Sequence, residues 1–144
     1  MVRVWADLTG IGMQAIPYAA GGAHVARMLQ GGDCAIVVSY TGESPERMPM
    51  CHLAEFRARG VRVVGVTSEG DNYLRESSDA VLTILGQESL YEKVGPFSSR
   101  ASTACALDML YAAIFARDYE RNLAYLSQSS RELERGRLPG GGQA

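Results

Sequence analysis

Three hydroxyl-bearing residues stand close together in the segment Ser39-Tyr40-Thr41-Gly42-Glu43-Ser44. The hydroxyls of Ser39, Thr41 and Ser44 can donate hydrogen bonds, and Gly42 lets a ligand approach the backbone closely. A run of β-branched residues precedes the segment and a helical pattern follows it, so the first N–H groups of that helix and its dipole would favour an anion. The segment therefore predicts a phosphate site that needs no metal.

The same residue types have a second interpretation. Ser and Thr between a strand and a helix are ordinary helix caps. Glu43 favours an anion site only if its carboxylate points to solvent or accepts hydrogen bonds from sugar hydroxyls. Pro45 suits a first helical turn, whereas Pro49 lacks an N–H, so the regular helix is expected to start later or to be distorted at first.

Acid–base chemistry has only two weak candidates, Glu88 and His52, and no catalytic residue is assigned. An aldose–ketose isomerase must move a proton between neighbouring carbons, which a carboxylate or imidazole could do. His52 stands beside Cys51 and Leu53 in a predicted helix, where a structural role is the simpler interpretation. Glu88 in Gln87-Glu88-Ser89 equally fits a solvated turn.

The elements that position the segment are strands with nearly continuous β-branched sequence. Cys34–Ser39 and Val61–Thr67 are predicted as buried parallel strands, Ala80–Ile84 as a third, and Val2–Ala6 as an edge strand. Helices are predicted over residues 23–30, 48–59, 73–78, 101–117 and 118–134, with Gly60 ending the second of them. This alternation predicts an α/β fold with three layers, α/β/α, around a parallel sheet. Ligands of such sheets bind beyond the carboxyl ends of the strands, where the segment stands.

Length, composition and charge restrict the class of protein. With 144 residues, 47% of them hydrophobic, and a formal net charge of -2, one domain without a basic face is expected, which disfavours nucleic-acid and membrane partners. The three cysteines are widely spaced in largely apolar surroundings and are expected to be small buried residues rather than disulfides or metal ligands. The start lacks a signal-peptide pattern, so a cytoplasmic location is expected.

Residues 101–117 are apolar on nearly every side of the predicted helix, with Asp108 the main exception. Such a helix is expected to be buried all round, which in a small domain usually means one face on the sheet and another against a partner subunit. A homodimer or a higher homo-oligomer is therefore expected. Gly10-Ile11-Gly12 lacks the third glycine of a dinucleotide loop, so no cofactor is expected.

Several motifs together resemble the SIS (sugar isomerase) domain. They are Gly32-Asp33, the hydroxyl-rich segment 39–44, Gly60 and Val63-Val64-Gly65-Val66-Thr67-Ser68. The later motifs are similar to the RpiR branch of transcriptional regulators; they are Leu90-Tyr91, Ser98-Ser99-Arg100, Leu107-Asp108-Met109-Leu110 and Arg117-Asp118-Tyr119-Glu120. The resemblance covers roughly residues 33–126.

The resemblance implies a set of phosphosugar-binding residues. These are Ser39, Thr41, Gly42, Glu43 and Ser44, with Ser98 and Ser99 as second-rank candidates. Thr41 stands where the family usually has serine, and the change keeps the donor. The resemblance also implies an effector sensor of an RpiR-type regulator or a stand-alone relative. The alternatives are a sugar-phosphate isomerase and a fragment that only oligomerises.

Two departures from the family pattern concern the N-terminal part. Nothing before Cys34 resembles the helix-turn-helix domain of the RpiR branch, and the family's first βα unit also has no counterpart. We therefore expect about four strands, with Val2–Ala6 beside Cys34–Ser39 and residues 9–13 beside the phosphate loop. The expected boundaries are a phosphosugar-binding domain at residues 1–134 and a flexible tail at 135–144.

Overall fold

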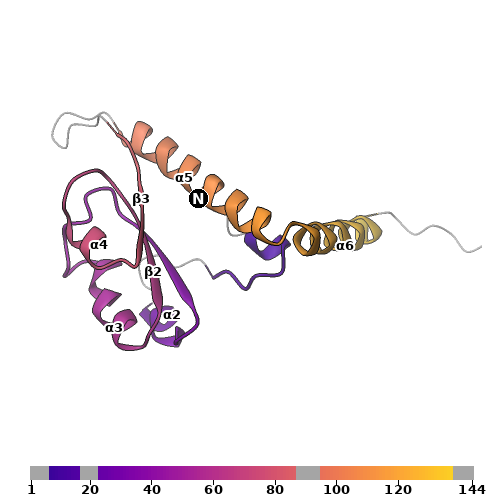
Figure 1. Ribbon diagram of the computed structural model, residues 1–144. Coiled ribbons are helices and arrows are strands. Elements are labelled where there is room, and N and C mark those ends of the chain that lie inside the picture. Colours follow the sequence, from indigo (N-terminus) through magenta and orange to yellow (C-terminus); the bar gives the residue numbers. More distant parts are fainter. Residues whose placement is uncertain (1–6, 17–22, 87–94, 138–144) are drawn as a thin grey trace, which may run out of the picture. The chain divides into compact units, whose positions relative to one another are not determined.

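The computed structural model of the chain describes residues 7–16, 23–86 and 95–137 (Figure 1). The predicted strand Val2–Ala6, Glu88 and the predicted tail from residue 138 onward lie outside these ranges. Two compact units are distinguished. We call Tyr18–Leu107 the sheet unit, and Met1–Pro17 together with Asp108–Ala144 the helical unit.

Three parallel strands form the sheet in the described part of the sheet unit. They are β1 (Cys34–Val38), β2 (Arg62–Thr67) and β3 (Ala80–Thr83), in the spatial order β1-β2-β3. The register pairs Ala35 with Val63 and Val64 with Ala80. The predicted α/β class and parallel sheet are therefore confirmed, and the three predicted strands are each found within a residue of their bounds.

Helices cover one face of this sheet. They are α2 (Ala23–Met28), the 3-10 turn η1 (Met50–His52), α3 (Leu53–Ala58) and α4 (Tyr73–Glu76), and Figure 1 shows α3 and α4 together on one side of the strands. One continuous core joins strands and helices; its buried members are Ala26, Ala35, Val37, Met50, Leu53, Phe56, Val61, Val63 and Leu74. Each large member contributes about 1.5–3 kcal/mol through burial, so this core holds the loops of the sheet in place.

The start and end of α3 lie where Pro49 and Gly60 predict them. The regular helix begins after Pro49, as the missing N–H of that proline requires, and Gly60 ends it with a positive φ of 72°. The N–H of Gly60 donates to the carbonyl of Arg57 at 3.1 Å. This compact turn leads directly into β2.

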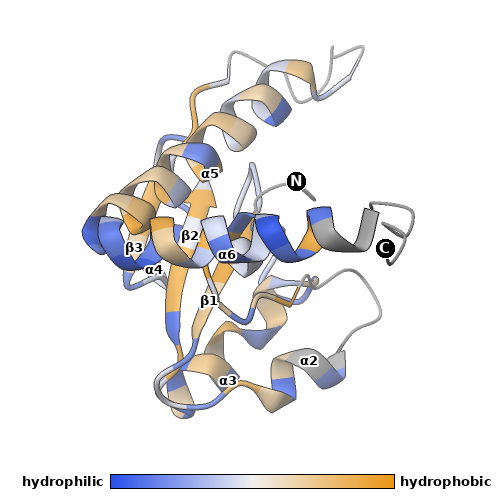
Figure 2. Ribbon diagram, turned by 90° about the vertical axis from the view of Figure 1, so that its right-hand side faces the viewer, coloured by the Kyte–Doolittle hydropathy of each residue, from blue (hydrophilic) through white to orange (hydrophobic). Residues whose placement is uncertain are grey.

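The other face of the sheet is less covered than the sequence predicts. Ala35 and Val37 of β1 are buried, whereas Ile36 and Val38 are only half-buried, so burial alternates along this strand. Apolar colour nonetheless marks the strands in Figure 2. The β-branched run is thus suited to a sheet covered on both faces, and β1 presents one half-covered face in the described chain.

Helix α5 (Phe97–Arg117) begins four residues before the predicted start, because the polar residues Ser98 and Ser99 form its first turn. Only Ser99 and Leu107 of this helix are buried, and Met109 is 68% exposed. The single chain therefore leaves most of α5 uncovered, and the expectation that a partner subunit buries the rest of the helix stays a prediction. Apolar composition shows that a helix is suited to burial, but not that its own chain supplies the cover.

The helical unit contains residues 7–16, the end of α5 and α6 (Tyr119–Arg137). Residues 7–10 are helical, and Leu8 and Ile11 are buried. The Nδ2 group of Asn122 donates to the carbonyls of Ile114 at 3.4 Å and Phe115 at 3.1 Å, so it caps the end of α5. α6 continues past the predicted boundary at residue 134, and the predicted division into domain and tail stays a prediction.

The expectation of buried cysteines is wrong. Cys34, Cys51 and Cys105 are all free and exposed. Cys34 precedes Ala35, the first residue of β1 that points into the core, and Cys51 occupies the outer side of η1. Apolar neighbours in the sequence did not determine which side of each element faces the core.

Candidate functional site

The hydroxyl-rich loop 39–44 lies at the carboxyl ends of β1 and β2. The N–H of Ser39 donates to the carbonyl of Val66 at 3.0 Å, which extends the pairing of the two strands by one residue. The carbonyl of Tyr40 then accepts from the N–H of Ser68 at 3.0 Å and from the Thr67 hydroxyl at 3.2 Å. The loop is therefore attached to the end of β2, in the place that open parallel sheets use for ligands.

Gly42 is the tightest point of the loop. It is buried, with a φ of 63°, and a Cβ added to it would lie 2.2 Å from Oδ1 of Asn72 and 2.9 Å from Oγ1 of Thr67. The carbonyl of Gly42 accepts from the N–H of Leu74 at 2.9 Å, and its N–H donates to the Ser39 hydroxyl at 3.2 Å. Glycine is required here by both the backbone conformation and the space.

Several donors of the loop remain available. In the described part of the chain, no hydrogen bond uses the N–H of Thr41, Glu43 or Ser44, or the hydroxyl of Thr41 or Ser44. Thr41 and Ser44 are half-buried, so their hydroxyls are neither sealed in the core nor fully solvated. Glu43 is exposed, as a carboxylate beside an anion would have to be. Backbone N–H groups and hydroxyls gathered in one loop can bind an oxyanion without a metal.

Two further loops meet the hydroxyl-rich loop at this edge of the sheet. Asn72 begins α4 after β2, and its Oδ1 accepts from the N–H of Arg75 at 3.0 Å. Beyond β3, the carbonyl of Gly86 accepts from the Tyr40 hydroxyl at 2.7 Å. The sequence reasoning did not select Asn72 or Tyr40. An asparagine just before a helix is a recognisable N-cap signal. The contact of Asn72 with Gly42, however, depends on the pairing of β1 with β2, which the sequence does not show directly.

The second-rank candidates lie on the first turn of α5. Ser98 is exposed, while Ser99 is 7% exposed and its hydroxyl is 3.5 Å from the carbonyl of Pro96. Ser99 also accepts, through its carbonyl, from the Thr103 hydroxyl at 2.7 Å. These contacts do not involve the loop 39–44, so the role of Ser98 and Ser99 in binding stays a prediction.

The weak catalytic candidates gain no support. The Nδ1 atom of His52 lies 3.8 Å from Oε2 of Glu55, and its ring centroid lies 6.1 Å from that of Phe56. These contacts are on its own helix and fit a structural role. Glu88 lies outside the described residues. No group of three or more His, Cys, Asp or Glu side chains in residues 7–16, 23–86 and 95–137 is arranged to hold a metal ion.

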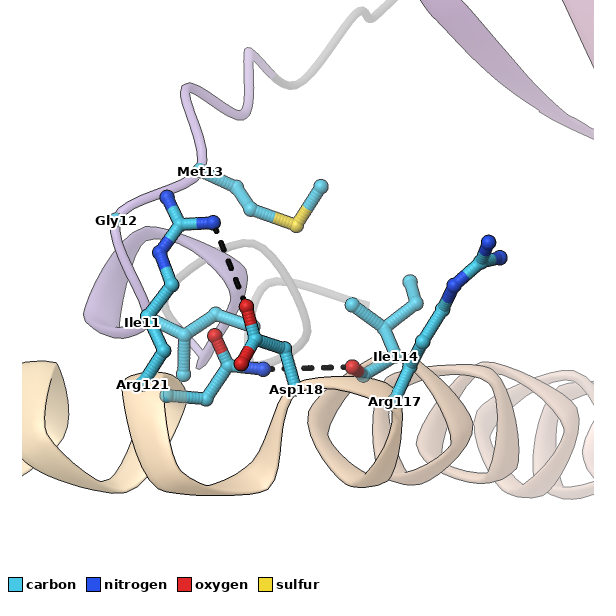
Figure 3. Close-up of a pocket in the computed structure, with 8 residues that line it drawn as sticks. Ile11, Gly12, Met13, Ile114, Arg117, Asp118 and Arg121 are labelled. Atoms are coloured by element: carbon cyan, nitrogen blue, oxygen red, sulfur yellow. Dashed lines mark hydrogen bonds and ion pairs between the residues drawn. The ribbon is translucent and has the colours of Figure 1, made fainter.

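Two cavities lie elsewhere, and the loop lines neither of them. The larger, of about 320 Å³, belongs to the helical unit (Figure 3). It is lined by Ile11, Gly12, Met13, Ile114, Arg117, Asp118, Arg121 and Asn122. Figure 3 shows Arg121 directed toward Asp118, and the two lie 3.7 Å apart. The Arg121 side chain is 75% exposed, so its charge is well hydrated and is partly neutralised by Asp118. For this reason we do not assign the anion site to this cavity.

The smaller cavity, of about 260 Å³, lies at the amino ends of β2 and β3, the edge opposite the loop. Arg62 lines this cavity, and the Nη1 atom of its guanidinium lies 2.9 Å from Oδ1 of Asp79 in an ion pair. The N–H of Val63 donates to the same carboxylate at 2.7 Å; this bond and then the bond from Arg62 lower the pKa of Asp79. Asp79 therefore helps to fix the register of β2 and β3.

No helix in the described ranges has the length and apolar character needed to cross a membrane.

Comparison with known proteins agrees with this geometry. The family model for the SIS domain matches residues 10–113. The HTH-type transcriptional regulator HexR of Pseudomonas aeruginosa is 29% identical over 108 residues, which are 73% of this chain and 36% of HexR. The chain thus spans about a third of the length of this curated relative.

Solved structures share the fold. The Vibrio vulnificus NanR protein, solved in complex with ManNAc-6P, superposes with a TM-score of 0.77 at 20% identity, over 96% of this chain and 52% of NanR. The sugar isomerase domain of the RpiR transcription factor from Sphaerobacter thermophilus gives a TM-score of 0.65 at 23% identity, over 90% of this chain and 70% of that one. The hydroxyl-rich loop at the sheet edge and the match over most of the chain lead to one conclusion: this chain belongs to the SIS domain family.

Proposed function

We propose that the chain is a phosphosugar-binding SIS domain that acts as the effector sensor of an RpiR-type transcriptional regulator or of a stand-alone relative. The observation that carries the proposal is the loop 39–44, whose N–H groups at Thr41, Glu43 and Ser44 take no part in the hydrogen bonds of the described chain. A phosphate dianion supplies several acceptors at once, which such a loop can satisfy.

The relatives support the sensing role. HexR is a transcriptional regulator, and NanR was solved with a sugar phosphate. Sensing needs binding without turnover, and His52, one of the two weak catalytic candidates, contacts Glu55 and Phe56. A cytoplasmic location, where sugar phosphates are made and consumed, forms part of the proposal.

Thermal unfolding in the presence of hexose, pentose and amino-sugar phosphates tests the proposal. A ligand at about 100 times its Kd stabilises the native state by about 2.7 kcal/mol. This corresponds to a rise in Tm of roughly 8 °C for a chain of this size. The double variant Thr41→Ala/Ser44→Ala should lose most of this rise while keeping the Tm of the unliganded protein nearly unchanged, because both hydroxyls are free of hydrogen bonds in the described chain.

Matched controls separate a loop effect from a general one. The double variant Ser127→Ala/Ser130→Ala removes two exposed hydroxyls of α6 and should respond to the phosphosugar as the natural chain does. No response of the natural chain to any phosphosugar or to inorganic phosphate contradicts the proposal. If a ligand binds, incorporation of deuterium from solvent into the sugar would identify an isomerase, and its absence supports a sensor.

We further propose that α5 pairs with a second copy of the chain. Phe97 is 70% exposed and Met109 is 68% exposed on this mostly apolar helix, which Figure 2 shows largely in apolar colours interrupted by a few hydrophilic segments. Sedimentation equilibrium should give a dimer for the natural chain and a monomer for Met109→Asp, since a carboxylate buried at the contact would be left unpaired. A monomer for the natural chain contradicts this pairing.

A further inference from the structure

Asn72 is a buried amide whose two polar atoms have different surroundings. The residue is 7% exposed, and it begins α4 with an extended backbone, φ -155° and ψ 161°. The side-chain oxygen accepts from the N–H of Arg75 at 3.0 Å. An N–H can only donate, so the atom that faces it must be Oδ1, and the other terminal atom is Nδ2.

The Nδ2 atom has two unused hydrogens. Among the hydrogen bonds of residues 7–16, 23–86 and 95–137, none uses Nδ2 of Asn72. Every fully buried side-chain nitrogen or oxygen of these residues has a partner, so an unpartnered Nδ2 must reach the surface. A donor that reaches the surface of an otherwise buried residue can be satisfied by water or by a bound ligand.

The position of this donor is fixed against the hydroxyl-rich loop. The carboxamide packs on Gly42 so closely that a Cβ there would lie 2.2 Å from Oδ1 and 2.7 Å from Cγ of Asn72. The bond from the N–H of Leu74 to the carbonyl of Gly42, at 2.9 Å, ties the same two segments together. The carboxamide of Asn72 is therefore held against Gly42, the residue of the loop that stands between Thr41 and Ser44.

We propose that Nδ2 of Asn72 donates a hydrogen bond to the anion that the loop 39–44 binds, so that Asn72 is a binding residue as well as the cap of α4. This inference rests on the proposed function and adds a donor from the strand-β2 side of the site. A neutral carboxamide suits this place, because its oxygen is engaged by the N–H of Arg75 while its nitrogen carries two donor hydrogens.

The competing explanation is that Asn72 serves only as a helix cap. Two substitutions separate the roles, since serine and aspartate both cap helices well. Asn72→Ser keeps the cap and removes Nδ2, so it should weaken phosphate binding about tenfold or more, the usual effect of losing a bond to a charged group. Asn72→Asp keeps the cap and places a negative charge at the loop, so it should weaken binding further.

NMR gives a direct readout, because side-chain amides and backbone N–H groups appear in the same ¹⁵N spectrum. The probe is inorganic phosphate, titrated at constant ionic strength against chloride. The Nδ2 signals of Asn72 should shift together with the N–H signals of Thr41, Glu43 and Ser44, with one common Kd. The Nδ2 signals of Asn122 are the internal control, since they are bonded to two backbone carbonyls and should not shift.

Asn122→Ser is the matched variant. It removes an equally buried amide in the helical unit, where Asn122 is 6% exposed, and should lower the Tm while leaving phosphate affinity unchanged. If the loop signals shift but the Asn72 signals do not, and Asn72→Ser binds phosphate as the natural chain does, the inference about Asn72 is overturned while the proposed function survives. If no loop signal shifts with phosphate or a phosphosugar, both fail together.

Discussion

Replacing Gly42 by alanine should destabilise the protein far more than an ordinary surface substitution. The backbone at Gly42 has a φ of 63°, a left-handed conformation that costs a residue with a side chain about 1 kcal/mol. The new methyl group would also lie 2.2 Å from Oδ1 of Asn72 and must displace it. Displacing Oδ1 removes the cap that Asn72 provides to α4, which costs about 1–2 kcal/mol more. The total loss in the free energy of unfolding is then about 2–3 kcal/mol.

The chain offers a control with the same backbone demand and no packing demand. Gly70 has a φ of 86°, and nothing lies within 4 Å of a Cβ added there. Gly70→Ala should therefore cost only about 1 kcal/mol. Thermal or urea unfolding of both variants should show Gly42→Ala lower in Tm than Gly70→Ala by roughly 3–6 °C. Equal losses for the two variants would refute the packing of Asn72 on Gly42, and with it the geometry of the loop.

Three other predictions concern the framework around the loop. Tyr40→Phe removes the bond to the Gly86 carbonyl and should cost about 1 kcal/mol in urea unfolding; no loss would mean that this bond is not formed. Leu74→Ala removes a side chain that is 0% exposed and should cost about 2–5 kcal/mol, whereas Leu133→Ala, at a residue 69% exposed, should cost little; similar losses would contradict the core assignment. The pKa of Asp79 is lowered on folding, so its contribution to stability is present above the ordinary carboxyl pKa and is lost as the pH falls below about 4. The Tm of the natural chain should therefore fall in that range more steeply than that of Asp79→Asn, and parallel curves would argue against this role.

The sequence predicted the strands and the loop because their signals are local. The β-branched runs of β1 and β2 read as strands over a few residues, and Gly60 marks the end of α3 by itself. The hydroxyl-rich loop was recognisable for the same reason, since its donors are consecutive in the chain. Its position at the carboxyl edge of the sheet followed from the parallel topology.

The contacts that complete the site depend on pairing between distant segments. Asn72 meets Gly42 only because β1 and β2 are neighbours in a fixed register, and a capping residue seen in the sequence does not reveal which loop it touches. Tyr40 reaches Gly86 across the end of β3 for the same reason. Burial of α5 stays a prediction, because composition records what a helix can bury and not which surface covers it.

Isothermal titration calorimetry with a matched pair of ligands addresses the phosphate loop most directly. The pair is the phosphosugar that raises the Tm most and the same sugar without its phosphate. We expect the natural chain to bind the phosphorylated sugar and to show no heat with its parent, and Thr41→Ala/Ser44→Ala to bind the phosphosugar at least about tenfold more weakly. Equal affinity for the two sugars, or an unchanged affinity in the double variant, would show that the loop after β1 does not hold a phosphate.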